Sequence, residues 1–273
     1  MLDHLNIVGK IGSMALIRPG DLDIDYNTLS RISAELRPGM VWVTSGATEI
    51  GRIDHIKRTG HALPDDEAAK ADYAAQGQAI LMASYRQFVR PEYGLRQLLV
   101  EHQHFNDPEK REHIRHLLLR AAEQGAVPIV NYNDPVSDDE NRKMELSHLR
   151  AAGQGAVECV DNDETAAVLA DLVGAKTLVI LTSTEGIYLD PHDPATLVRE
   201  VIAANPEALA EKIRALQAHC HGASRAGAHG AYAKLSYILP PACKGTQVII
   251  GHARHRLSDL LEDRVPHTRI GLT

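Results

Sequence analysis

Short apolar segments alternate with longer amphipathic segments along most of this chain. Several short segments, such as 127–130, 177–182 and 248–250, are nearly continuous runs of branched apolar residues. Such runs are typical of strands that are buried on both faces of a sheet. Strands that alternate with helices predict a mostly parallel sheet with helices on both faces. We expect strands at 5–11, 40–45, 95–100, 126–131, 177–182 and 247–251.

Residues that favour helix ends separate the predicted helices from their neighbours. Asp25 precedes one amphipathic segment, and Asp107 with Pro108 precedes a second that ends at Gly125. Pro206 begins a third. Aspartate caps the free N–H groups of a first turn, proline fits there, and glycine commonly follows a last turn. The segment 137–154 is different, because it is charged, then only weakly helical, and we interpret it as a lid or an insertion.

Polar residues gather where the predicted strands end, which is where open α/β sheets bind their ligands. Each group also has an ordinary structural explanation, such as a strand end, a tight turn or a helix N-cap. The last group is a glycine-rich turn that leads into a helix carrying Lys234, but it does not match the P-loop pattern. The groups lie at 10–13, 44–47, 131–134, 161–164, 182–188 and 227–234.

The order and spacing of these groups are more informative than any one of them. Together they resemble the catalytic domain of glutamate 5-kinase, a branch of the amino acid kinase superfamily, over almost the whole chain. The segments that carry the resemblance are KIGS, VTSGA, AAQGQ, VPIVNYND, DNDETAAVLA, LTSTEGIY and GAHGAYAKL.

The resemblance implies a fold and two lobes that bind different substrates. It implies an α/β fold, a three-layer αβα sandwich around a mainly parallel sheet of about eight strands. Residues 1–163 would form the acceptor-binding lobe and residues 164–273 the nucleotide-binding lobe of one amino acid kinase domain. The carboxy-terminal RNA-modification-type domain that many glutamate 5-kinases append is not expected here.

The resemblance also implies a reaction. Members of this family transfer the γ-phosphoryl group of ATP to a carboxylate, so we expect a kinase that acts on glutamate or a glutamate-like amino acid, as in proline biosynthesis. Catalysis of this kind depends mainly on positioning and on neutralising charge. By position, Lys10 and Lys234 would flank the transferred group, and Asp163 would orient both lysines.

Binding residues follow from the same resemblance. ATP is the expected cofactor, with Mg²⁺ held largely by its phosphates, so no residue is assigned to a metal. Histidine pairs such as His113 and His116 lack a third ligand at metal-site spacing, which favours a solvated role. The expected substrate-binding residues are Ser45, Gly46, Asp134 and Asn162. The expected nucleotide-binding residues are Gly12, Ser13, Thr182, Ser183, Tyr188, Gly227, Gly230 and Lys234.

Four features depart from the family pattern. Tyr132 stands where the family usually has glutamate, and Ser183 where it usually has aspartate. The segment 229–231 reads His-Gly-Ala in place of Gly-Gly-Met, and the connection between Asp134 and Asp161 is longer than usual. These departures keep two alternatives open. One is a kinase of the acetylglutamate, aspartate, carbamate or uridylate type, and the other is a non-catalytic nucleotide-binding protein with a storage or regulatory role.

Composition narrows the expected partners. The 273 residues carry a net charge of −7 and show no basic stripe interleaved with aromatic residues, which argues against a nucleic-acid partner. No apolar run is long enough to span a bilayer. The three cysteines are widely spaced, which suits a reducing cytoplasm. We therefore expect a cytoplasmic protein, with a small amino acid or carboxylate as its substrate and a homo-oligomeric assembly.

Overall fold

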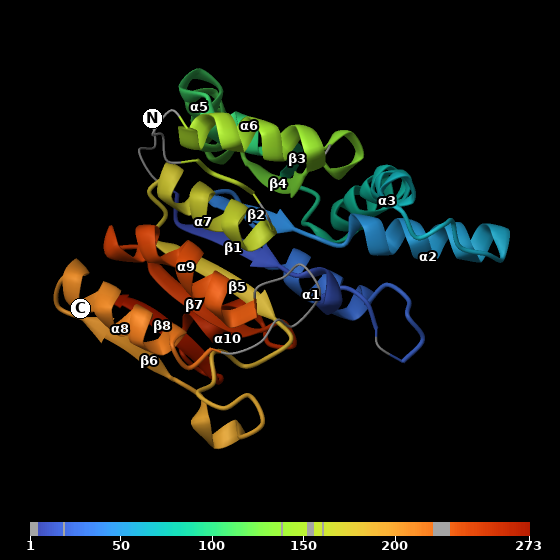
Figure 1. The fold of residues 1–273 in the computed structure, drawn as a ribbon. Helices are drawn as coiled ribbons and strands as arrows, with labels where there is room; N and C mark the ends of the chain where they lie inside the picture. Colours follow the sequence, from blue (N-terminus) through green and yellow to red (C-terminus); the bar gives the residue numbers. More distant parts are fainter. Residues whose placement is uncertain (1–4, 19, 138, 152–155, 160, 221–229) are drawn as a thin grey trace.

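A computed structural model describes residues 5–18, 20–137, 139–151, 156–159, 161–220 and 230–273. Its centre is a sheet of eight strands in the order β3-β4-β2-β1-β5-β7-β8-β6 (Figure 1). The strands are β1 (Ile7–Ile11), β2 (Met40–Thr44), β3 (Gly94–Val100), β4 (Ala126–Tyr132), β5 (Thr177–Thr182), β6 (Glu200–Ala203), β7 (Gln247–His252) and β8 (His267–Leu272).

The sheet is mainly parallel, as predicted. All neighbouring strands run parallel except β7 and β8, which pair antiparallel. The six strands expected from apolar runs are confirmed, with small differences at their ends. The pattern did not single out β6, which has four residues and forms one edge of the sheet, or β8, which lies next to it. In β8 the buried residues include His267 and Thr268, so the strand does not look like an apolar run.

Helices cover both faces of the sheet, which completes the expected three-layer αβα sandwich. Residues of α5, α7, α8 and α9 pack on one face, and residues of α1, α3 and α10 pack on the other. No helix within the described ranges is long and apolar enough to cross a membrane. The helices are α1 (Tyr26–Ser33), α2 (Ala47–Thr59), α3 (Glu67–Phe88), α4 (His102–Asn106), α5 (Pro108–Glu123), α6 (Asp139–Ala151), α7 (Asn162–Leu172), α8 (Pro206–Gln217), α9 (Gly230–Cys243) and α10 (Leu257–Leu261).

Several helix ends are those that the sequence predicts. The side chains of Asp25 and Asp107 accept hydrogen bonds from backbone N–H groups in the first turns of α1 and α5. Pro206 is the first residue of α8, where the side chain of Asn205 caps the helix. The weakly helical segment 137–154 contains α6, although residues 138 and 152–154 lie outside the described part of the chain.

Helices α2 and α3 cross at very short range, beyond the carboxyl end of β2 (Figure 1). A Cβ atom placed on Gly77 would lie 1.8 Å from the backbone oxygen of Ala47, and one on Gly51 would lie 1.9 Å from that of Tyr73. Only glycine fits such a close approach of two backbones. The two glycines therefore fix where α3 lies beside the carboxyl ends of β2 and β4.

Candidate active site

A largely buried cluster of three charged side chains lies where β1, α7 and α9 meet. Asp163 at the start of α7 is 2% exposed, and its carboxylate contacts two ammonium groups. The Nζ atom of Lys10 in β1 lies 2.6 Å from Asp163 Oδ1, and that of Lys234 in α9 lies 2.7 Å from Asp163 Oδ2. The structure thus brings together the three residues predicted to be catalytic.

The position of Asp163 follows from the cap of its helix. The side chain of Asp161 accepts hydrogen bonds from the backbone N–H groups of Asp163 and Glu164, at 2.7 and 3.1 Å. Burial by itself would raise the pKa of Asp163, but the charges and hydrogen bonds of Lys10 and Lys234 outweigh burial and lower it. Asp163 is therefore an ionised carboxylate that holds two lysines in place.

A chain of side-chain amides lies beside this cluster. Asn162 Nδ2 donates to Ser45 Oγ at 2.9 Å and to Asn131 Oδ1 at 3.0 Å. Asn131 Nδ2 in turn donates to Gln78 Oε1 at 2.9 Å. The chain joins the carboxyl ends of β2 and β4 to the start of α7. Its remaining atoms Asn162 Oδ1 and Gln78 Nε2 are buried and have no hydrogen-bond partner among the described groups.

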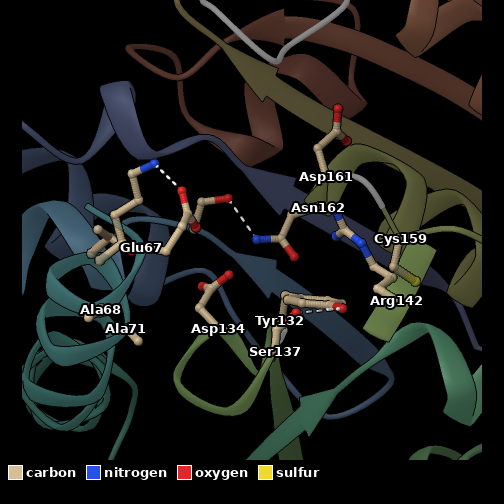
Figure 2. A pocket seen from close by; sticks show the side chains of 13 residues that line it. Glu67, Ala68, Ala71, Tyr132, Asp134, Ser137, Arg142, Cys159, Asp161 and Asn162 are labelled. Atoms are coloured by element: carbon tan, nitrogen blue, oxygen red, sulfur yellow. Dashed lines mark hydrogen bonds and ion pairs between the residues drawn. The ribbon is translucent and has the colours of Figure 1, made fainter. Parts of the chain in front are cut away.

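Three of the four predicted substrate residues, Ser45, Asp134 and Asn162, share one cavity of about 680 Å³, here called the β4 cavity (Figure 2). Figure 2 shows Glu67 and Ala71 of α3 on one side of it and Arg142 and Cys159 on the opposite side. Gly46 does not line the cavity but starts α2 behind Ser45, with a φ of 100° that glycine adopts without strain. The lining residues are Ser45, Thr48, Glu67, Ala68, Lys70, Ala71, Tyr132, Asp134, Ser137, Arg142, Cys159, Asp161 and Asn162.

Two aspartates of the β4 cavity have raised pKa values. Burial and the neighbouring charge of Glu49 raise the pKa of Asp134 to about 6, against a smaller opposing effect of Arg142. Burial and the charge of Asp163 raise the pKa of Asp161. A positively charged ligand group close to either carboxylate would stabilise its ionised form.

A second cavity of about 350 Å³, here called the β5 cavity, lies between the carboxyl end of β5 and α9. Most predicted nucleotide residues line it, and Gly227 lies outside the described residues. Gly12 instead lies beside the ammonium group of Lys10, and its N–H donates to the carbonyl oxygen of Leu181 at 3.4 Å, while Ser13 lies close to Gly46. The lining residues are Thr182, Ser183, Thr184, Gly186, Ile187, Tyr188, Pro191, His219, Cys220, Gly230, Ala231, Lys234 and Ile250.

The three-residue cluster links the two cavities. Lys234 lines the β5 cavity, and Asn162, the residue before Asp163, lines the β4 cavity.

The sequence did not indicate that Glu67, Lys70 and Arg142 also line the β4 cavity. Gln78 ends AAQGQ, one of the segments that carry the resemblance, but the sequence indicated no role for this residue. No set of three or more His, Cys, Asp or Glu side chains in the described ranges is arranged to hold a metal ion.

Known proteins resemble this chain in sequence. The model of the amino acid kinase family matches residues 6–252. The chain is 29% identical to glutamate 5-kinase from Bifidobacterium animalis subsp. lactis, over 95% of this chain and 64% of that protein. It is 30% identical to glutamate 5-kinase from Xylella fastidiosa, over 96% of this chain and 64% of that protein. The chain thus spans less than two thirds of the length of these relatives.

Solved structures share the fold. Carbamate kinase from Giardia lamblia bound to AMP-PNP aligns with a TM-score of 0.63 and 14% identity, over 99% of each chain. UMP kinase from Ureaplasma parvum aligns with a TM-score of 0.54 and 12% identity, over 98% of this chain and 99% of that one. At such identities the likeness shows the fold alone.

Proposed function

Because the chain belongs to the amino acid kinase family, we propose that it transfers the γ-phosphoryl group of ATP to the carboxylate of glutamate or a glutamate-like amino acid. The similarity to glutamate 5-kinases supports this acceptor class. One carboxylate oxygen of the acceptor forms a bond to the γ-phosphorus. The bond from that phosphorus to the β–γ bridging oxygen breaks, and ADP leaves with its electron pair.

The observation that best supports this reaction is the Lys10–Asp163–Lys234 cluster between two cavities. Phosphoryl transfer redistributes negative charge over the transferred group and the departing oxygen. Two ammonium groups held in place by one buried carboxylate need little rearrangement to stabilise that charge. Asp163 positions the two lysines, and the lysines contact the reacting phosphoryl group.

We place ATP in the β5 cavity. Ile187 and Ala231 provide apolar contact area for a base, and Lys234 contacts Asp163. The structural likeness to a carbamate kinase bound to AMP-PNP supports use of the nucleotide. Mg²⁺ usually binds through the phosphates of a nucleotide, with few protein ligands, and it would supply further neutralisation of charge there.

We place the acceptor in the β4 cavity. The raised pKa of Asp134 indicates a carboxylate that is stabilised when an ammonium group arrives. The unpartnered Asn162 Oδ1 can accept a second hydrogen bond from the same ammonium, and Ser45 Oγ lies next to it. An α-amino acid supplies that ammonium together with a carboxylate for phosphorylation. Residues 1–163 thus supply most of the acceptor site, and residues 164–273 most of the nucleotide site.

ADP release with a panel of acceptors tests the proposal. The panel contains glutamate, acetylglutamate, aspartate, carbamate and UMP, each with Mg²⁺ and ATP. We expect the highest kcat/KM with glutamate or a compound that shares its amino and carboxylate groups, and loss of the signal in Lys10→Met. A best acceptor without an amine would favour another kinase of the family. ATP binding without ADP release from any acceptor would favour a storage or regulatory protein.

A further inference from the structure

One wall of the β4 cavity carries a positive charge from α6, which lies in the connection between Asp134 and Asp161. Arg142 lies on α6 and lines the cavity next to Tyr132 and Ser137 (Figure 2). It hydrogen-bonds the Tyr132 hydroxyl, which also accepts a hydrogen bond from Ser137 Oγ at 3.3 Å. Burial raises the pKa of Tyr132 and that of Cys159, the latter to about 12, so these neighbours are neutral near pH 7.

Negative charge lies in another part of the same cavity, at Asp134. In Figure 2, Tyr132 and Asn162 lie between Asp134 and Arg142. Glu49 adds its negative charge beside Asp134, whereas Arg142 is near enough to act on the pKa of Asp134 in the opposite direction. The cavity therefore offers negative charge at Asp134 and a separate positive charge at Arg142, which suits a ligand with an ammonium and an anionic group.

The structure holds Arg142 at this wall through its helix. Arg142 and Glu145 are three residues apart, so they lie on the same face of α6. Glu145 Oε2 contacts Nε2 of the buried His102 at 2.6 Å, and Leu146 on the same face is 5% exposed. The helix that carries Arg142 is thus held by contacts outside the cavity.

We infer that Arg142 determines acceptor specificity by binding the second carboxylate of the acceptor, the one that does not receive the phosphoryl group. This inference rests on the proposed function and narrows the acceptor class to amino dicarboxylates. A guanidinium matches a carboxylate with two parallel hydrogen bonds, and a neutral amide in that place loses one acceptor oxygen and the charge. Tyr132 and Ser137 supply further hydrogen-bonding groups at the same wall.

The test compares L-glutamate with its α-amide, which keeps the ammonium and the γ-carboxylate but lacks the second negative charge. We expect the unmodified protein to prefer glutamate in kcat/KM by about tenfold to a hundredfold, the range for a hydrogen-bonded charge pair. Arg142→Gln should remove the preference by lowering kcat/KM for glutamate alone, and Arg142→Lys should keep part of it. Lys143→Gln is the matched control, because Lys143 is an exposed cation on the same helix.

Titration calorimetry of the same two compounds without ATP separates this inference from the proposed function. If glutamate is phosphorylated and Arg142→Gln keeps the preference, the inference is wrong and the proposed function stands. If no phosphorylation occurs but glutamate binds more tightly than its amide, and only in the presence of Arg142, the proposed function is wrong and the inference stands. Equal or absent binding of both compounds, without turnover, contradicts both.

Discussion

The two cavities at the carboxyl edge of the sheet differ in charge. The β4 cavity carries seven charged or ionisable side chains, of both signs, which are Glu67, Lys70, Tyr132, Asp134, Arg142, Cys159 and Asp161. In the β5 cavity the charged or ionisable groups among the described lining residues are Lys234, His219, Tyr188 and Cys220, and the other residues are small, apolar or hydroxylic. A wall with fixed charges selects a small ionic compound, whereas an apolar wall accepts a flat base. The difference supports the proposed placement of acceptor and nucleotide.

The largest effect should come from the lysines between the cavities. We expect Lys10→Met and Lys234→Met each to lower kcat by about a hundredfold or more, because each removes a positive charge from the transferred group. Both KM values should change much less. Each variant keeps one ammonium beside Asp163, so both should fold. Lys244→Met is the control, since Lys244 pairs with Asp171 at the surface. Near-normal kcat in both variants would refute the assignment.

The ionisation of Asp134 should affect binding in the β4 cavity but not in the β5 cavity, and pH-dependent kinetics should show this difference. Its pKa of about 6 means that it is protonated below this pH and ionised above it, so kcat/KM for an amine-bearing acceptor should rise with pH and level off above about 6. Asp134→Asn should raise the acceptor KM by about tenfold or more and remove that rise. The KM for ATP should stay nearly constant, and a parallel change in both KM values would contradict the separation of the sites.

The same substitution has a consequence for stability. Because the pKa of Asp134 is raised on folding, its ionisation disfavours the folded state, and this penalty grows as pH rises from about 4 through about 6. Without acceptor, Asp134→Asn should therefore raise the melting temperature at pH 8 and leave it unchanged at pH 4. Circular dichroism melts at the two pH values give the comparison. A lower melting temperature at pH 8 would show that the carboxylate is stabilised by contacts.

A substitution in the β5 cavity should affect the KM for ATP and leave the acceptor KM nearly unchanged, the reverse of the effect of Asp134→Asn. Ser183 lines this cavity and is exposed, so a larger side chain there should narrow the cavity without disturbing the core. We expect Ser183→Trp to raise the KM for ATP by about tenfold and to leave the acceptor KM within about twofold. Initial rates with each substrate varied in turn measure both. An effect confined to the acceptor would place the nucleotide elsewhere.

The two cavities also differ in how much of them the sequence predicts. The β5 cavity is formed mainly by two local segments. Thr182 ends a recognisable strand, and Ser183 and Tyr188 lie in the turn that follows it. The β4 cavity collects residues from α2, α3, β4, α6 and α7, which are far apart in the chain. Asp134 and Asn162 could be found because they follow β4 and begin α7. Which residues of α3 and α6 face them depends on tertiary packing.

Two particular contacts show why the sequence pattern does not predict how α3 and α6 pack around the cavity. The place of Glu67 and Lys70 follows from the close crossing of α2 and α3, which depends on Gly51 and Gly77. An isolated glycine in a helix indicates no partner by itself. The place of Arg142 depends on a contact between Glu145 and His102, 43 residues apart. The central strands were predictable because burial on both faces makes them continuously apolar.

The smallest effect should come from the contact that holds α6. Glu145→Gln keeps the shape of the side chain but removes its charge, which weakens the bond to His102 Nε2. The Glu145 side chain is 50% exposed, so the pair contributes little, and we expect the KM for the acceptor to rise only about twofold to fivefold. If Glu145 acts only by positioning Arg142, the substitution should have no further effect in Arg142→Gln, a result that a double-mutant cycle measures. Glu112→Gln is the control, because Glu112 also contacts a histidine, His116 at 3.0 Å, but does not line the β4 cavity. An equal rise in both variants, or full additivity in the cycle, would mean that α6 does not hold Arg142 through this contact.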